Sequence, residues 1–305
     1  MEHFLRRLAL NWPRPVTRFR NPLARQPLPP SGDSDITSGV ATEALRVEEL
    51  EKYFPPAAGG WRGFLHPLAK ATSPALRGVS FSVQSGEVVA LVGANGAGKS
   101  TLLRILTTLL LPTKGRAWVG GADVAREPAR VLRQLGFHSG SDSSFYARLT
   151  ARENLRLFAA LNNIAHAEAS ARIAHLSELL HLDSVLERQV RTLSTGTVHR
   201  LGLARALLHR PSVVLLDEPT RSLDPLAAAE FRRFLRDEVV CKQGATVLFA
   251  SHTLAEVEQL AARVALLHSG RLLACAPPDR LREDTSTATL EQAIEILLLR
   301  ADGGA

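Results

Sequence analysis

Gly93-Ala94-Asn95-Gly96-Ala97-Gly98-Lys99-Ser100 has the form G-x-x-x-x-G-K-[ST] and directly follows the apolar run Val88 to Val92. A buried strand that breaks into a glycine loop and then enters a helix near Thr101 is a cradle for phosphate. The glycines let consecutive backbone N–H groups turn toward an anion, and the helix N-terminus adds partial positive charge. We therefore expect the loop and Thr101 to bind a nucleoside triphosphate, with Lys99 on the outer phosphates and the Ser100 hydroxyl on Mg²⁺.

A second apolar run ends in two carboxylates. Residues Val213 to Asp217, followed by Glu218, indicate a buried parallel strand with acidic side chains at its C-terminal end. Ligands of open α/β sheets bind at that end of the strands. We expect Asp217 to hold Mg²⁺, directly or through water, and Glu218 to take a proton from a water aligned on the γ-phosphate. A solvated strand end is the alternative for an isolated pair, and the glycine loop disfavours it.

Composition narrows the class of protein. The chain has 305 residues, 45% of them hydrophobic, which suffices for a full core in one large domain or a domain with a subdomain. No uncharged apolar run approaches the ~18–20 residues that cross a bilayer, so we expect no membrane span. Two cysteines, Cys241 and Cys275, fit a reducing cytosol. The net charge of +7 comes without a basic block interleaved with aromatics, which argues against nucleic-acid binding.

The first 43 residues differ from the rest of the chain. They are basic and rich in proline, and we expect a disordered extension that buries little. Four apolar residues within them fall at helical spacing and allow two interpretations. One is a short amphipathic helix on an anionic membrane or a partner; the other is a frayed terminus, because an isolated helix of ~12 residues is marginal. These residues are Phe4, Leu5, Leu8 and Trp12.

From residue 44 onward the patterns become regular. Strands alternate with helices, which predicts an α/β fold with a mostly parallel sheet covered by helices. A Pro/Gly-rich stretch over 55–74 indicates a surface insertion, a helix is expected over 101–110, and residues 150–208 have mostly helical periodicity. The predicted strands cover 45–54, 77–83, 87–92, 116–119, 213–217, 246–250, 264–268 and 271–274.

A third motif lies between the glycine loop and the acidic strand end. Leu193-Ser194-Thr195-Gly196-Thr197 stands before a helix that Ser194 is suited to cap. With the two motifs above, it resembles the nucleotide-binding subunit of an ATP-binding cassette (ABC) transporter, whose signature is LSGGQ, over roughly Leu45 to Arg300. The resemblance implies a P-loop NTPase core with an antiparallel β subdomain and a helical subdomain at about 138–197. The ATPase domain would cover 44–276, and a C-terminal helical tail 277–305.

The resemblance also implies a site shared between two subunits. Ser194, Thr195 and Gly196 would bind the γ-phosphate of ATP held by the opposite subunit, so that two cassettes clamp ATP head to tail. Ser222 and Asp224 match the D-loop that crosses this interface. The expected partner is therefore a second cassette, either identical or different.

Two further residues gain a role from the resemblance. His252, after the strand over 246–250, matches the switch histidine that contacts the γ-phosphate, so Glu218, His252 and Lys99 are the expected catalytic residues. Tyr53 stands where the family places an aromatic ring that stacks on adenine.

The sequence departs from the family pattern at two places. The family carries a glutamine that contacts Mg²⁺ and the transmembrane partner, whereas residues 136–146 contain none; Asp142 or Ser141 is the expected substitute, because oxygen ligands suit a hard cation. In the signature, Thr195 replaces a glycine and Thr197 a glutamine, which narrows the backbone conformations at the phosphate contact. We therefore expect hydrolysis, at a slow rate.

The single copy of each motif excludes some classes of ABC protein. One glycine loop and one signature exclude a tandem-cassette translation factor, and the absence of sustained heptads excludes a chromosome-maintenance ATPase. Residues 144–155 resemble exporters of the ABC-2 class.

The expected protein is an ATP-binding and ATP-hydrolysing subunit, with ATP and Mg²⁺ as its cofactors. It would power a separate transmembrane permease, which determines the cargo, and would lie peripherally on the cytoplasmic face of the membrane. The alternative is a soluble ABC-type regulatory or adaptor ATPase that is not engaged in transport.

Overall fold

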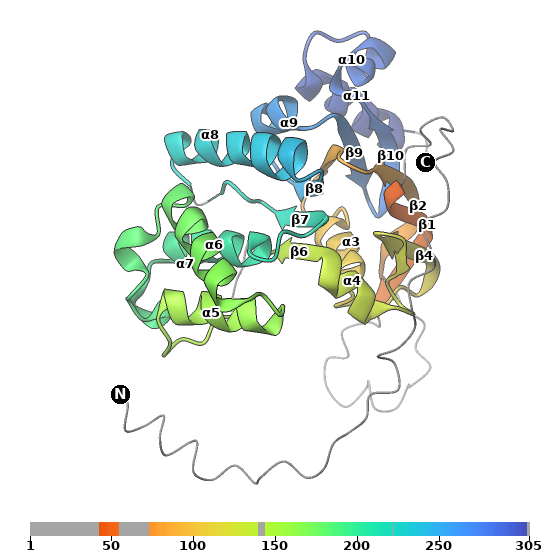
Figure 1. Ribbon diagram of the computed structural model, residues 1–305. Helices are drawn as coiled ribbons and strands as arrows, with labels where there is room; N and C mark the ends of the chain where they lie inside the picture. Colours follow the sequence, from red (N-terminus) through yellow and green to blue (C-terminus); the bar gives the residue numbers. More distant parts are fainter. Residues whose placement is uncertain (1–42, 55–72, 140–143, 222, 304–305) are drawn as a thin grey trace, which may run out of the picture. The chain divides into compact units, whose positions relative to one another are not determined.

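The computed structural model describes residues 43–54, 73–139, 144–221 and 223–303, which belong to one compact unit over residues 41–305 (Figure 1). The N-terminal extension predicted over 1–43, with its apolar residues at helical spacing, lies outside the described residues except for Glu43, which begins a strand. The insertion predicted over 55–74 also lies outside them, except for Ser73 and Pro74, which begin another strand. Asp142 and Ser222 are not described either. The interpretations of these segments remain predictions.

The larger of two sheets is mostly parallel, as predicted. Its six strands follow the order β10-β9-β3-β8-β7-β6, and only β10 pairs antiparallel with its neighbour. The central strands are apolar and buried, because helices cover both faces of a parallel sheet. The strands are β3 (Val88–Val92), β6 (Leu135–His138), β7 (Val213–Asp217), β8 (Thr246–Ala250), β9 (Arg263–His268) and β10 (Arg271–Ala276).

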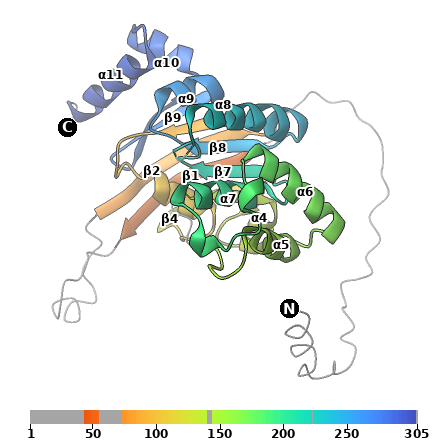
Figure 2. The same cartoon turned by 90° about the vertical axis from the view of Figure 1, so that its left-hand side faces the viewer.

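Side chains of these strands alternate between two hydrophobic cores, one on each face of the sheet. In β3, Leu91 belongs to the core that contains the apolar side of α3 (Lys99–Leu106). Its neighbour Val92 belongs to the core that contains α8 (Pro225–Phe234). Figure 2 shows α8 and α9 together on one side of the strands. The sheet is thus fixed from both faces, and its edge is the remaining place for a ligand.

The smaller sheet is antiparallel, in the order β2-β1-β4-β5. It shares its core with α3 and with one face of the larger sheet. This arrangement confirms the antiparallel β subdomain that the resemblance implied. The strands are β1 (Glu43–Phe54), β2 (Ser73–Gln84), β4 (Lys114–Val119) and β5 (Ala122–Asp123).

The helix after the glycine loop is shorter than the apolar pattern over 101–110 predicts. It begins at Lys99 and ends at Leu106. The Thr107 hydroxyl donates to the Arg104 carbonyl at 3.1 Å, and Thr108 has φ +61°, in the left-handed region. Two adjacent β-branched threonines disfavour helix, and the second one turns the chain away.

The remaining helices surround the larger sheet. Figure 1 shows α5, α6 and α7 gathered beside β6 and β7, while α10 and α11 lie near β9. The π-helix η3 (Leu235–Lys242) continues α8, and short 3-10 turns η1 (Asp183–Val185) and η2 (Val190–Thr192) precede α7. The other helices are α4 (Pro128–Gln134), α5 (Ala151–Leu161), α6 (His166–Leu179), α7 (Thr195–Leu207), α9 (Leu254–Leu260), α10 (Pro278–Thr285) and α11 (Leu290–Asp302).

Arg205 joins α7 to the segment that precedes α5. Its guanidinium lies 5.4 Å from the ring centroid of Phe145 and 5.3 Å from that of Phe158. It also donates to the Ser144 hydroxyl and, at 3.5 Å, to the Phe137 carbonyl. A guanidinium against aromatic rings is attracted by their π-faces, and more so when partly desolvated. Arg205 therefore holds three segments together.

A buried amide closes the turn before α5. Asn154 is fully buried, and its Oδ1 accepts from the Tyr146 backbone N–H at 2.9 Å. Its Nδ2 donates to the carbonyls of Tyr146 at 3.1 Å and Thr150 at 2.9 Å. The Thr150 and Glu153 side chains complete a capping box at the same helix end. These bonds tie the turn at Tyr146 to the first turn of α5, and the capping box provides partners for N–H groups that the helix leaves unpaired.

Replacing Asn154 by Ala should lower the free energy of unfolding by about 2–3 kcal/mol, because it removes the hydrogen bonds that a fully buried amide makes to the turn. Asn162 is the matched control, since it lies at the other end of α5, is exposed and donates one bond, to the Phe158 carbonyl at 2.9 Å. Asn162→Ala should cost less than about 1 kcal/mol. Urea unfolding of both variants measures the difference, and equal losses would contradict this account.

Candidate functional site

The glycine loop connects β3 to α3 as the sequence predicts, and Gly98 fixes its shape. Gly98 has φ +109° and is the N-cap residue of α3. A Cβ on Gly98 would lie 2.6 Å from the Ala75 carbonyl oxygen and 2.8 Å from Cδ2 of Leu76, both in β2. The antiparallel sheet therefore packs so closely against the loop that only glycine fits.

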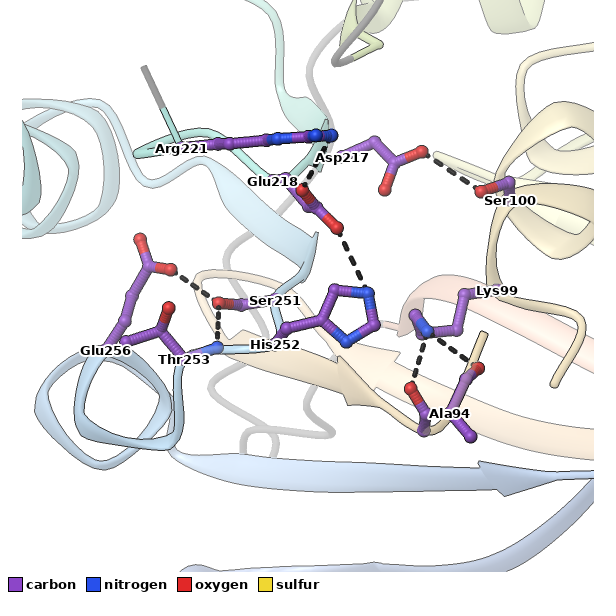
Figure 3. Close-up of polar contacts among 11 residues, drawn as sticks. Ala94, Lys99, Ser100, Asp217, Glu218, Arg221, Ser251, His252, Thr253 and Glu256 are labelled. Carbon is purple, nitrogen blue, oxygen red and sulfur yellow. Dashed lines mark hydrogen bonds and ion pairs between the residues drawn. The ribbon is translucent and has the colours of Figure 1, made fainter. Parts of the chain in front are cut away.

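Lys99 lies inside the loop that precedes it. It is 7% exposed, and its Nζ donates to the carbonyls of Gly93 at 2.6 Å and Ala94 at 3.0 Å (Figure 3). Burial lowers the pKa of the Lys99 ammonium from its usual value, while the negative charges of Asp217 and Glu218 oppose this shift. The ammonium thus lies within the loop, and the negative charges of Asp217 and Glu218 attract it.

Ser100 and Asp217 bring two oxygens together at the ends of α3 and β7. The Ser100 hydroxyl donates to Asp217 Oδ2 at 3.1 Å. A serine hydroxyl and a carboxylate are ligands that Mg²⁺ accepts, and Mg²⁺ keeps several waters besides. The donor set fits the predicted metal, and Ser100 and Asp217 would be among its protein ligands.

Glu218 follows β7 in a strained backbone conformation. Its φ of +50° is left-handed, which is uncommon for a residue with a side chain, and its N–H donates to the Ala250 carbonyl at 2.9 Å. Its Oε1 lies 3.1 Å from Nε2 of His252, and its Oε2 lies 3.3 Å from Nη1 of Arg221. The strained turn therefore directs the carboxylate toward His252, which follows the neighbouring strand β8.

One cavity of about 390 Å³ joins these groups. It contains side chains from the glycine loop, from the end of β7 and from the end of β8, so three motifs far apart in the sequence share it. Residues that sequence reasoning did not single out also line it, Arg221 among them. The lining comprises Ala75, Asn95, Gly96, Gly98, Lys99, Ser100, Thr101, Leu103, Arg104, Phe137, Ser139, Asp217, Glu218, Arg221 and His252.

The loop that carries His252 rests on a buried pair that the sequence pattern did not reveal. Glu256 is 3% exposed, and its Oε2 accepts from the Ser251 hydroxyl at 2.6 Å. The Ser251 oxygen in turn accepts from the Thr253 N–H at 3.0 Å (Figure 3). These bonds hold the backbone on both sides of His252. A serine and a glutamate five residues apart carry no signal in the sequence.

The signature residues do not line this cavity. Ser194 caps α7 as expected: its Oγ accepts from the Thr197 N–H at 3.2 Å and lies 2.8 Å from Thr197 Oγ1. Thr195 and Gly196 begin the helix behind it. The first turn of α7 carries partial positive charge and no acidic residue, so it suits an anion. An anion bound there would lie outside this chain's own cavity, which these residues do not line.

Of the predicted site residues that the structure describes, Tyr53, Gly93, Ala94, Ala97 and Asp224 also lie outside the cavity lining. Asp224 caps α8, accepting from the N–H groups of Leu226 at 3.1 Å and Ala227 at 3.0 Å. These bonds, that of Ala227 foremost, lower the pKa of the Asp224 carboxyl from its usual value. Tyr53 lies near the end of β1, where its N–H donates to Thr113 Oγ1 at 3.1 Å.

Comparisons with known proteins agree on one family. The sequence model of the family described as "ABC transporter" matches residues 76–221. The ABC transporter ATP-binding protein NatA of Bacillus subtilis is 36% identical over 76% of this chain and 93% of its own length. The chain belongs to the ABC transporter family.

Other members of the ABC transporter family show the same likeness. The bacitracin transport ATP-binding protein BcrA of Bacillus licheniformis is 37% identical over 67% of this chain, which spans 65% of that relative. A solved structure described as the ATP-binding subunit of an ABC transporter superposes with a TM-score of 0.72 at 28% identity, covering 84% of this chain and 99% of the other.

Family membership confirms the fold class and the ATP hydrolase activity expected from the sequence. This ABC ATPase has, over the described ranges between residues 43 and 303, no helix with the length and apolar character of a membrane span.

Gly98→Ala should cost at least about 2 kcal/mol more unfolding free energy than Gly86→Ala, because only the former adds a backbone clash to the strain of a positive φ. Gly86 has φ +77°, and a Cβ there would meet nothing within 4 Å, so it isolates the strain alone. Urea unfolding of the two variants gives the difference. The same cost for both would show that β2 does not confine the loop.

Proposed function

We propose that this chain is the energy-coupling ATPase of an ABC-2-type exporter, peripheral on the cytoplasmic face of the membrane and joined to a separate permease. One observation carries the proposal: Lys99, Ser100, Asp217 and Glu218 meet around a single cavity. The relatives support the transport role, since NatA is an ABC transporter ATP-binding protein and BcrA is a bacitracin transport ATP-binding protein.

The proposed roles follow from the charge of each group. The glycine loop and Thr101 bind the phosphates through backbone N–H groups, and the Lys99 ammonium neutralises the outer ones. Ser100 and Asp217 hold Mg²⁺, which neutralises charge that develops on the phosphate oxygens. Glu218 accepts the proton of the attacking water, and His252 orients Glu218 and contacts the γ-phosphate.

A second cassette is part of the proposal because the signature lies outside this chain's cavity. Ser194, Thr195 and Gly196 stand at the N-terminus of a 13-residue helix, which attracts an anion presented by another molecule. Ser222 and Asp224 would lie at the same interface. The second cassette is a copy of this chain or a related subunit. Tyr53 as an adenine contact and Asp142 as a further Mg²⁺ ligand remain proposals.

Association with a permease is tested by purification in mild detergent. The tagged full chain should co-purify from membranes with a multi-spanning protein, and a high-salt wash should not release it if a protein rather than lipid retains it. Recovery of the chain only from the soluble fraction, with ATPase activity intact, would favour the regulatory or adaptor ATPase instead.

Glu218→Gln should slow ATP turnover about 10²- to 10⁴-fold, because the amide cannot accept a proton from water. ATP binding should persist, so the variant should form a long-lived dimer in MgATP. Steady-state hydrolysis and analytical ultracentrifugation measure the two effects, with Glu283→Gln, exposed on α10, as the control. Wild-type turnover in Glu218→Gln would exclude Glu218 as the base.

Lys99→Ala should weaken MgATP binding about 10- to 100-fold, the value of a charge-assisted contact to phosphate. Lys242→Ala is the control, since Lys242 is exposed and pairs with Glu238 on η3, at 2.6 Å. Calorimetric titration with MgATP gives the affinities, and circular dichroism verifies that both variants fold. Unchanged affinity in a folded Lys99→Ala would refute the phosphate cradle.

A further inference from the structure

Arg221 is a cation of the cavity that no motif accounts for. It stands three residues after Glu218, in the turn that follows β7, and its side chain is 71% exposed. Its Nη1 lies 3.3 Å from Glu218 Oε2, and the residue lines the same cavity as the glycine loop. Figure 3 shows the Glu218 carboxylate between Arg221 and His252.

Both oxygens of Glu218 are therefore occupied. Oε1 faces Nε2 of His252 at 3.1 Å, and Oε2 faces the Arg221 guanidinium. A general base needs an oxygen within hydrogen-bond reach of the water it deprotonates. Release of either contact opens a wider approach for a water to the carboxylate, and the exposed contact, to Arg221, is the easier to break.

The charges of the cavity indicate where the guanidinium goes. Lys99 is buried, and its ammonium already donates to the carbonyls of Gly93 and Ala94. Arg221 is exposed and pairs with Glu218 at the cavity wall, and an exposed ion pair contributes little in water. Its planar fork matches phosphate oxygens in pairs. A triphosphate entering the cavity offers more negative charge than one carboxylate and competes with Glu218 for this group.

We propose that Arg221 contacts the terminal phosphate of bound ATP and rests on Glu218 when that phosphate is absent. The inference rests on the proposed ATPase site and adds a residue to it. ADP lacks the terminal phosphate, so Arg221 stays on Glu218 in the ADP-bound chain. The same movement thus recognises ATP and frees Oε2 of the base.

Glu218→Gln provides the background for the test, because it prevents turnover and removes the ion pair. In that background, Arg221→Ala should weaken MgATP binding about 10-fold and leave MgADP binding within about twofold. Arg221→Lys keeps the charge but loses the paired geometry and should fall between. Calorimetric titration with each nucleotide gives the ratio, and Arg236→Ala, exposed and paired with Asp237 on η3, should change neither affinity.

The outcomes distinguish a failure of the Arg221 contact from a failure of the proposed ATP site. If Arg221→Ala weakens both nucleotides equally, or neither, while Lys99→Ala weakens both, Arg221 does not bind the terminal phosphate and the inference is wrong. If Lys99→Ala itself leaves both affinities unchanged, the ATP site is wrong and Arg221 loses its role with it. A selective loss for MgATP, in a variant with the unfolding curve of its parent, supports the proposal.

Discussion

The site depends on the register of three parallel strands. Leu91 of β3 lies opposite Ala250 of β8, and Ala250 lies opposite Asp217 of β7. Because the strands run in one direction and end level, the glycine loop, the acidic pair and the loop of His252 leave the sheet at one edge. A shift of one residue in any strand would reverse its side chains and remove its motif from the cavity.

The two cores keep this register. Each central strand sends alternate side chains into opposite cores, so a slipped strand would put the side chains of each core into the other, where they do not fit. The antiparallel sheet contributes more than burial, because the Ala75 carbonyl of β2 confines the loop at Gly98. The second sheet thus helps to shape the phosphate loop, although none of the sequence motifs lies in that sheet.

Local patterns in the sequence predicted the parts of the site that depend on local geometry. The glycine loop, the strand that ends at Asp217 and the cap at Ser194 each follow from a few adjacent residues. The Arg221–Glu218 and Ser251–Glu256 contacts could not be predicted in this way, because they depend on the conformation of the turns after β7 and β8. The apolar pattern continues past Thr107 and Thr108, so the sequence predicts a longer helix than α3, which ends at Leu106. The two-residue strand β5 is too short to show a period.

Arg205 gives α7 a mechanical property. The helix has 13 residues and thus a length of about 20 Å, with the clamp on Phe145 and Phe158 near one end and Ser194 at the other. The segment around Phe145 and the cap at Ser194 are therefore attached to opposite ends of one helix.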